Sequence, residues 1–162
     1  MNTAQKGFAL LESMIVVTIA GILMAIAVPS FSDQMARRRL EGVAVELSSD
    51  LQYARSEAIS KNRPVQLLAD ADGRSYSVNY VTPAGAPVSP ALKVHTLPSG
   101  ITALASAGNS VQFDALRGMT TNTADFTVAS TKTTMSLLAS TSPVGRVRLC
   151  SPSGSFAGFA TC

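Results

Sequence analysis

Few residues in this sequence can support catalysis or bind a metal. Tryptophan is absent, histidine occurs once, at His95, and cysteine occurs twice, at Cys150 and Cys162. A structural zinc site usually needs four ligands, and His95 is far from both cysteines in the sequence. The motifs Gly-x-Ser-x-Gly and His-Glu-x-x-His and a phosphate-binding glycine loop are also missing. We therefore predict no catalytic residue, no cofactor and no metal site, and we interpret His95 as a strand or surface residue of a protein that is not an enzyme.

Charge is scarce as well, and it is unevenly distributed. Charged residues make up 14% of the 162 residues, and the stretch from Phe126 to Cys162 contains no acidic residue. Apolar residues recur throughout, which excludes a disordered acidic tail. The length fits one globular domain behind an N-terminal anchor.

That anchor is a long apolar run from Phe8 to Val28, in which Glu12 is the one charged residue. As a helix it would span roughly 31 Å, about the thickness of a bilayer core. A signal peptide or a simple anchor are the ordinary interpretations. However, the small residue Gly7 precedes the run, and no Ala-x-Ala cleavage site follows it. A carboxylate within lipid costs a few kcal/mol, so Glu12 should have a partner.

This arrangement resembles the class III leader of type IV pilins and type II secretion pseudopilins. The resemblance implies that a prepilin peptidase cuts between Gly7 and Phe8 and that the new N-terminus at Phe8 is methylated. Glu12 would then pair with the Phe8 amine of a neighbouring subunit and set the register of assembly. Gly21 and Pro29 match family positions at which the helix can break in a filament. Ala9 and Ser13 depart from the usual family residues.

After Pro29 a helical pattern resumes and continues to about Ser60. The predicted apolar stripe consists of Leu40, Val43, Ala44, Leu47, Leu51, Ala54, Ala58 and Ile59. Spacings of three and four place these residues on one helix face. The other sides are predicted to carry Arg38, Glu41, Glu46, Asp50, Arg55 and Glu57. Asn62 and Pro64 should end the helix.

From Val65 the period changes to two, which indicates strands. We expect a hairpin made of residues 65–68 and 76–81, joined by a turn at Asp70–Gly73. We favour a turn there over calcium binding by Asp70 and Asp72. Further strands are predicted at residues 92–97, 101–104, 111–113, 126–129, 135–138 and 144–149. The predicted fold class is α+β, with one long N-terminal helix packed on an antiparallel β head.

The residues at the helix-to-sheet junction make the resemblance to pilins more specific. Leu51-Gln52-Tyr53-Ala54-Arg55-Ser56-Glu57-Ala58-Ile59, followed by Asn62-Arg63-Pro64-Val65, resembles the GspH/FimT group of minor pilins and pseudopilins. This resemblance implies a type IV pilin fold with three parts. Residues 1–7 would form the leader, residues 8–28 the transmembrane or filament-core helix, and residues 29–162 the periplasmic head. We interpret Arg55 and Glu57 as residues that join the helix to the sheet.

An exported head would place Cys150 and Cys162 in an oxidising compartment, where two cysteines predict one disulfide. The predicted orientation in the membrane, with the head outside the cytoplasm, depends on the leader motif. Arg37, Arg38 and Arg39 outnumber Lys6, and the positive-inside rule would put the C-terminal side in the cytoplasm. We give the leader motif precedence and interpret these arginines as a solvated or headgroup-facing collar rather than a ligand site.

The Gly-Arg-x-Arg stretch of residues 145–148 is a candidate binding site for phosphate groups. Arg146 and Arg148 alternate with Val147 and Leu149, so both guanidinium groups should share one strand face and reach phosphates. Lys132 is expected to add a third charge, and Ser151 and Ser153 neutral donors. The stretch resembles that of FimT-type minor pilins that bind DNA during natural transformation. The alternative is the polar face of an edge strand, where arginine discourages aggregation.

Two functions follow from these patterns. The first is a minor type IV pilin of the inner membrane that is assembled into a pilus and binds extracellular double-stranded DNA without sequence preference. The second is a structural minor pilin, or a pseudopilin of a type II secretion system, that binds no DNA. Both imply other pilins or pseudopilins and a prepilin peptidase as partners.

Overall fold

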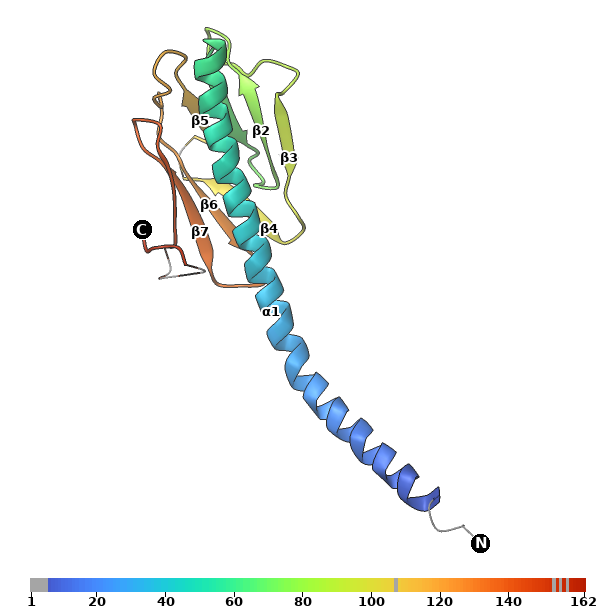
Figure 1. The fold of residues 1–162 in the computed structure, drawn as a ribbon. Helices are drawn as coiled ribbons and strands as arrows, with labels where there is room; N and C mark the ends of the chain where they lie inside the picture. The colour runs from blue at the N-terminus through green and yellow to red at the C-terminus, as the bar shows by residue number, and fades with distance from the viewer. Residues whose placement is uncertain (1–5, 107, 153, 155, 157) are drawn as a thin grey trace. The chain divides into compact units, whose positions relative to one another are not determined.

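The computed structural model describes residues 6–106, 108–152, 154, 156 and 158–162, and for residues 6–9 and 27–29 it describes the backbone alone. Within these residues, one helix is followed by eight strands (Figure 1). Their bounds are α1 Lys6–Lys61, β1 Val65–Ala69, β2 Ser75–Tyr80, β3 Lys93–Thr96, β4 Ile101–Ala105, β5 Ser110–Phe113, β6 Asp125–Ser130, β7 Ser136–Thr141 and β8 Val147–Cys150. Residues 1–5 of the predicted leader lie outside the described residues.

The chain divides into two compact units, residues 1–35 and residues 36–162. In the first unit, the apolar side chains between Leu10 and Ile26 are largely exposed. Among the described residues, one helix is long and apolar enough to cross a membrane, and it contains this stretch. The helix assignment runs through Gly21 and Pro29 without interruption. A break at these residues in an assembled filament therefore stays a prediction.

In the second unit, the helix buries an apolar stripe close to the predicted one. Leu40, Leu47, Leu51, Ala54 and Ala58 are fully buried. Two assignments were wrong. Ile59 is 46% exposed, because the buried stripe has turned away from it by the last helical turn, and Asp50 is buried at 4% exposure.

The predicted end of the helix is confirmed at Asn62. Asn62 adopts a left-handed conformation with φ of 50°. Its N–H donates to Ile59 O at 3.3 Å, and the N–H of Arg63 donates to Ala58 O at 3.2 Å. This pair of hydrogen bonds is a Schellman motif, which satisfies carbonyls that the helix end leaves without partners. Pro64 then leads the chain into β1.

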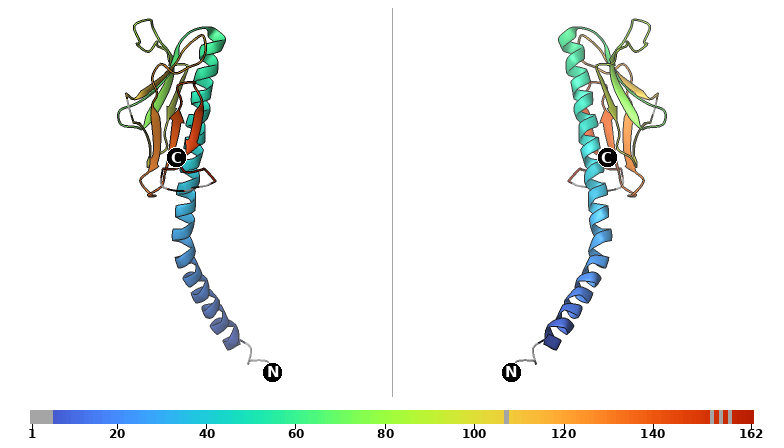
Figure 2. Two further views of the ribbon diagram at one scale, coloured as in Figure 1. Left: turned by 90° about the vertical axis from the view of Figure 1, so that its left-hand side faces the viewer. Right: turned by 90° about the vertical axis from the view of Figure 1, so that its right-hand side faces the viewer.

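The strands form two four-stranded sheets with the orders β3-β2-β1-β5 and β4-β6-β7-β8. All their pairings are antiparallel. The predicted hairpin is confirmed as β1 and β2, with Val65 opposite Tyr80. In the second unit both sheets lie on one side of the helix (Figure 2). Leu67, Phe113 and Phe126 pack with the helical stripe in a common core.

The last strand is shorter than predicted. Val144 and Arg146 belong to a tight turn rather than to a strand, because Gly145 has φ of 74° and its N–H donates to Ser142 O at 2.8 Å. A backbone bond from Ser142 N to Arg146 O closes the turn at 2.9 Å. β8 consequently begins at Val147.

Candidate functional site

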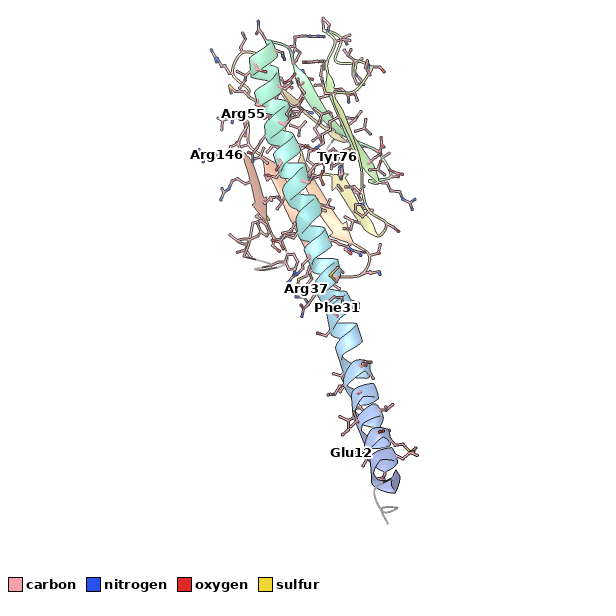
Figure 3. All side chains as sticks on the ribbon, turned by 45° about the vertical axis from the view of Figure 1, so that its right-hand side comes forward. Glu12, Phe31, Arg37, Arg55, Tyr76 and Arg146 are labelled. Carbon is pink, nitrogen blue, oxygen red and sulfur yellow. A yellow bond between two sulfur atoms is a disulfide. The ribbon has the colours of Figure 1, made fainter. Side chains whose placement is uncertain are left out.

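The N-terminal segment presents Glu12 without a partner in the described part of a single chain. Glu12 is exposed, and Leu11, Ile15 and Val16 around it on the helix are also exposed (Figure 3). Such an acid needs a counterion before it enters an apolar environment. The backbone of Gly7 and Phe8 is helical, but the side chain of Phe8 lies outside the described residues. Cleavage and methylation at this junction stay predictions.

Arg55 and Glu57 join the end of the helix to the sheets, as we interpreted them. The Nε of Arg55 donates to Gly118 O at 3.1 Å. The hydroxyl of Tyr80 donates to Glu57 Oε1 at 2.7 Å, and this bond raises the pKa of Tyr80. The guanidinium of Arg63 stacks over the Tyr80 ring at 4.3 Å.

A partly buried polar network between the helix and β2 and β3 was not predicted from the sequence. Asp50 accepts hydrogen bonds from the Tyr76 hydroxyl at 2.8 Å and from Lys93 Nζ at 2.7 Å. Burial, reinforced by the bond to Asp50, raises the pKa of Tyr76, and the same carboxylate raises the pKa of Lys93. His95 stacks on Tyr76 and lies 3.1 Å from Glu46 Oε1 through its Nδ1. His95 is a strand residue, as expected, but its part in this network was not predicted from the sequence.

One sequence signal could have revealed this network. Asp50 follows Leu47 by three residues and precedes Leu51 and Ala54, so it lies at the border of the apolar stripe. A buried carboxylate must be paired, and this one is. Because every member of the network has a partner from the head itself, the network is structural.

The predicted acidic turn serves local structure. Gly73 has φ of 66°, and its N–H donates to Asp70 O at 2.9 Å. The Asp72 carboxylate accepts the N–H of Arg74, and the Asp70 carboxylate accepts the Ser75 hydroxyl. These bonds support the turn interpretation. Within the described residues no group of three metal-binding side chains comes together.

The C-terminal arginines are both exposed. Arg146 ends the 142–146 turn and Arg148 lies in β8, an edge strand. Val147 lies between them and Leu149 follows Arg148; both are partly buried and pack against the core. The predicted alternation is therefore present, although Arg146 precedes the strand instead of lying in it. In the described part of the chain, neither arginine forms an ion pair.

Lys132 and the two serines do not gather around these arginines. Lys132 is exposed in the turn before β7, whereas Arg146 follows the opposite end of that strand. A six-residue strand separates its ends by about 17–20 Å. Ser151 is fully buried, so it cannot donate to an external phosphate. Ser153 lies outside the described residues.

A disulfide holds the chain end next to β8. Cys150 and Cys162 are bonded, as predicted, with their Cα atoms 5.0 Å apart. The N–H of Ser151 donates to Ala160 O at 2.9 Å, and the N–H of Cys162 donates to Ser151 O at 3.2 Å. Arg37, Arg38 and Arg39 are exposed on the helix, which leaves the collar interpretation as a prediction.

Comparisons with known proteins place these features in context. A family model described as type II transport protein GspH matches residues 43–157, and a prokaryotic N-terminal methylation motif matches residues 2–28. The solved structure of the type IV minor pilin FimU of Pseudomonas aeruginosa is 30% identical, with a TM-score of 0.60 over 70% of this chain and 89% of that one. The minor pseudopilin EpsH of Vibrio cholerae is 15% identical, with a TM-score of 0.55 over 70% of this chain and 98% of that one.

A curated relative agrees with these matches over a shorter stretch. A fimbrial protein of Pseudomonas aeruginosa is 39% identical over 77 residues, which are 48% of this chain and 49% of that protein. The chain thus spans about half the length of this curated relative. Together with the two solved structures, the arrangement of helix and sheets confirms the predicted type IV pilin fold.

Proposed function

Because the chain belongs to the GspH family and carries the prokaryotic N-terminal methylation motif, we propose that it is a minor type IV pilin that also binds DNA. A minor subunit is assembled into a filament alongside other pilins through its N-terminal helix. The likeness to the minor pilin FimU over 89% of that structure supports this role. The exposed apolar side chains of residues 10–26 supply the surface for such an assembly.

The route to the filament follows from the N-terminal motif. The precursor is held in the bacterial inner membrane by its apolar N-terminal helix, with the head in the periplasm. A prepilin peptidase removes residues 1–7 and methylates the new amine of Phe8. The Phe8 amine of one subunit then pairs with Glu12 of its neighbour, which offsets the desolvation of both charges. The assembled filament extends outside the cell.

One observation carries the DNA-binding part of the proposal. Arg146 and Arg148 are exposed, and within the described residues neither is paired with an acid. The stretch from Phe126 to the C-terminus contains no acidic residue that would repel a phosphate. Arginine presents a planar fork of donors that suits phosphate oxygens. Such contacts are made to the DNA backbone and not to the bases, so little sequence preference is expected. The bound DNA would be extracellular DNA taken up during transformation.

Gel-shift and fluorescence anisotropy with full-length, detergent-solubilised protein test this binding. The parent should bind duplex DNA with about micromolar or weaker affinity that falls as salt rises. The double variant Arg146→Gln plus Arg148→Gln should lose most of this binding. The control variant Arg37→Gln plus Arg38→Gln removes the same charge from the helix and should behave like the parent. Absence of salt-sensitive binding in the parent would contradict the DNA-binding role.

A second function is favoured by one specific observation. The matching family model is described as a type II transport protein. The alternative is therefore a minor pseudopilin of a type II secretion system that binds no DNA. Neighbouring genes distinguish the two, because pilus and competence genes indicate the first and secretion genes the second.

A further inference from the structure

Two turns that are distant in the sequence meet beside the end of the helix. They comprise residues 114–120, after β5, and residues 142–146, before β8. The N–H of Thr120 donates to Pro143 O at 3.0 Å, and the Thr120 hydroxyl donates to Ser142 O at 3.1 Å. These bonds hold the two turns together as one surface.

The two turns also approach each other closely at two glycines. A Cβ on Gly145 would lie 2.0 Å from Gly118 O and 2.9 Å from the Nε of Arg55, so no larger residue fits without displacing the backbone. Both glycines also have positive φ, 60° for Gly118 and 74° for Gly145. The Arg55 Nε bond to Gly118 O ties the same point to the helix. The backbone that carries the neighbouring residues is therefore firmly held.

Each of these glycines adjoins an exposed arginine. Arg117 precedes Gly118, and Arg146 follows Gly145. Their Cα atoms lie within about 14 Å of each other, because consecutive Cα atoms are about 3.8 Å apart and the two glycines are in contact. Arg146 also lines an open groove of about 390 Å³ together with Arg55, Gln52 and Ser56. Figure 3 shows Arg146 beside the helical turn that carries Arg55.

The single acid of the 114–120 turn is occupied by its own backbone. The Asp114 carboxylate accepts the N–H groups of Leu116 and Arg117, both at 3.2 Å. In the described residues it forms no ion pair with Arg117 or Arg146. Both guanidinium groups therefore keep their donors for an external anion.

We propose that Arg117 is a DNA-binding residue and forms one phosphate-binding surface with Arg146 and Arg148. The inference rests on the proposed function, since it extends the DNA site described above. Duplex DNA carries one charge per about 3.4 Å of axis on each strand, so several phosphates lie within the span of the two turns. Lys132, beyond the far end of β7, is not part of this surface.

Fluorescence anisotropy tests the role of Arg117 with full-length, detergent-solubilised protein and a duplex of mixed sequence. Arg117→Gln should weaken binding about tenfold and make the slope of log affinity against log salt shallower by about one. Arg117→Lys keeps the charge but loses the fork and should bind with intermediate affinity. Arg74→Gln removes one exposed charge directly after the 70–73 turn and should bind like the parent, as should Lys132→Gln.

The outcomes separate the two proposals. If the parent binds no DNA, the proposed function fails. If the parent binds, the Arg146/Arg148 double variant does not, and Arg117→Gln matches Arg74→Gln, then the wider surface is wrong and the proposed function stands. Unchanged melting temperatures would show that these exposed side chains were removed without harm to the fold.

Discussion

The two units of this chain differ in the exposure of their apolar side chains. In residues 10–26 they are exposed on a lone helix, with Leu11 at 61% and Val17 at 71% exposure. In residues 36–162 they form a core in which Leu51, Phe113 and Phe126 are fully buried. The second unit has a core of its own, whereas under the proposed function the apolar side chains of the first are buried by a membrane or by other subunits. Loss of assembly and loss of stability should therefore be separable by mutation.

The largest expected effect is on the first unit. Glu12→Val should leave processing largely intact but abolish incorporation into filaments, since the Phe8 amine then enters the filament core without a counterion. Immunoblots of sheared filaments measure this, and the melting temperature of the head should not change. Normal incorporation of the variant would contradict the pairing.

A pair of leucine truncations sharpens the contrast between the units. Leu51→Ala should lower the free energy of unfolding of the head by about 2–5 kcal/mol, because it leaves a cavity in the core. Leu11→Ala removes the same atoms from an exposed position and should change it by less than about 0.5 kcal/mol. Denaturant unfolding of the detergent-solubilised protein, followed by near-ultraviolet circular dichroism, measures both. Equal losses would show that the head depends on the first unit.

Removal of the disulfide should also destabilise the second unit, with a somewhat smaller effect than Leu51→Ala. Cys150→Ser plus Cys162→Ser should lower the free energy of unfolding by about 2–4 kcal/mol, since the bond restricts the unfolded chain. The same denaturant experiment gives the value. Mass spectrometry of periplasmic protein checks the premise, and two free thiols in the parent would reject it.

Alkaline pH should produce the smallest effect. The folded head raises the pKa of Tyr76 above its ordinary value of about 10. A raised folded pKa gives stability that is complete below about pH 10 and is lost as the pH rises further. Tyr76→Phe should therefore make the decline in melting temperature above pH 10 shallower. Tyr80 and Lys93 shift in the same direction, so some decline should remain. An unchanged pH profile in Tyr76→Phe would contradict this account.

The sequence predicted the features that depend on neighbouring residues. The apolar run, the helix end at Asn62 and the β1–β2 hairpin each depend on residues close together in the chain. The sheet order, the Asp50 network and the contact between Gly118 and Gly145 join residues far apart, so periodicity could not reveal them. Arg117 was missed for this reason, since the turn that carries it meets the 142–146 turn only in the folded chain. Lys132 was grouped with Arg146 by proximity in sequence, although a whole strand separates them.

The central claim is that the first unit is the processed, subunit-binding segment of a minor pilin. Tandem mass spectrometry of the N-terminal peptide tests it directly, with protein recovered from sheared surface filaments. The account predicts a chain that begins at Phe8 and carries a methylated amine, whereas a Gly7→Val variant remains a longer precursor in the membrane fraction. A mature chain that begins at any other residue would contradict it.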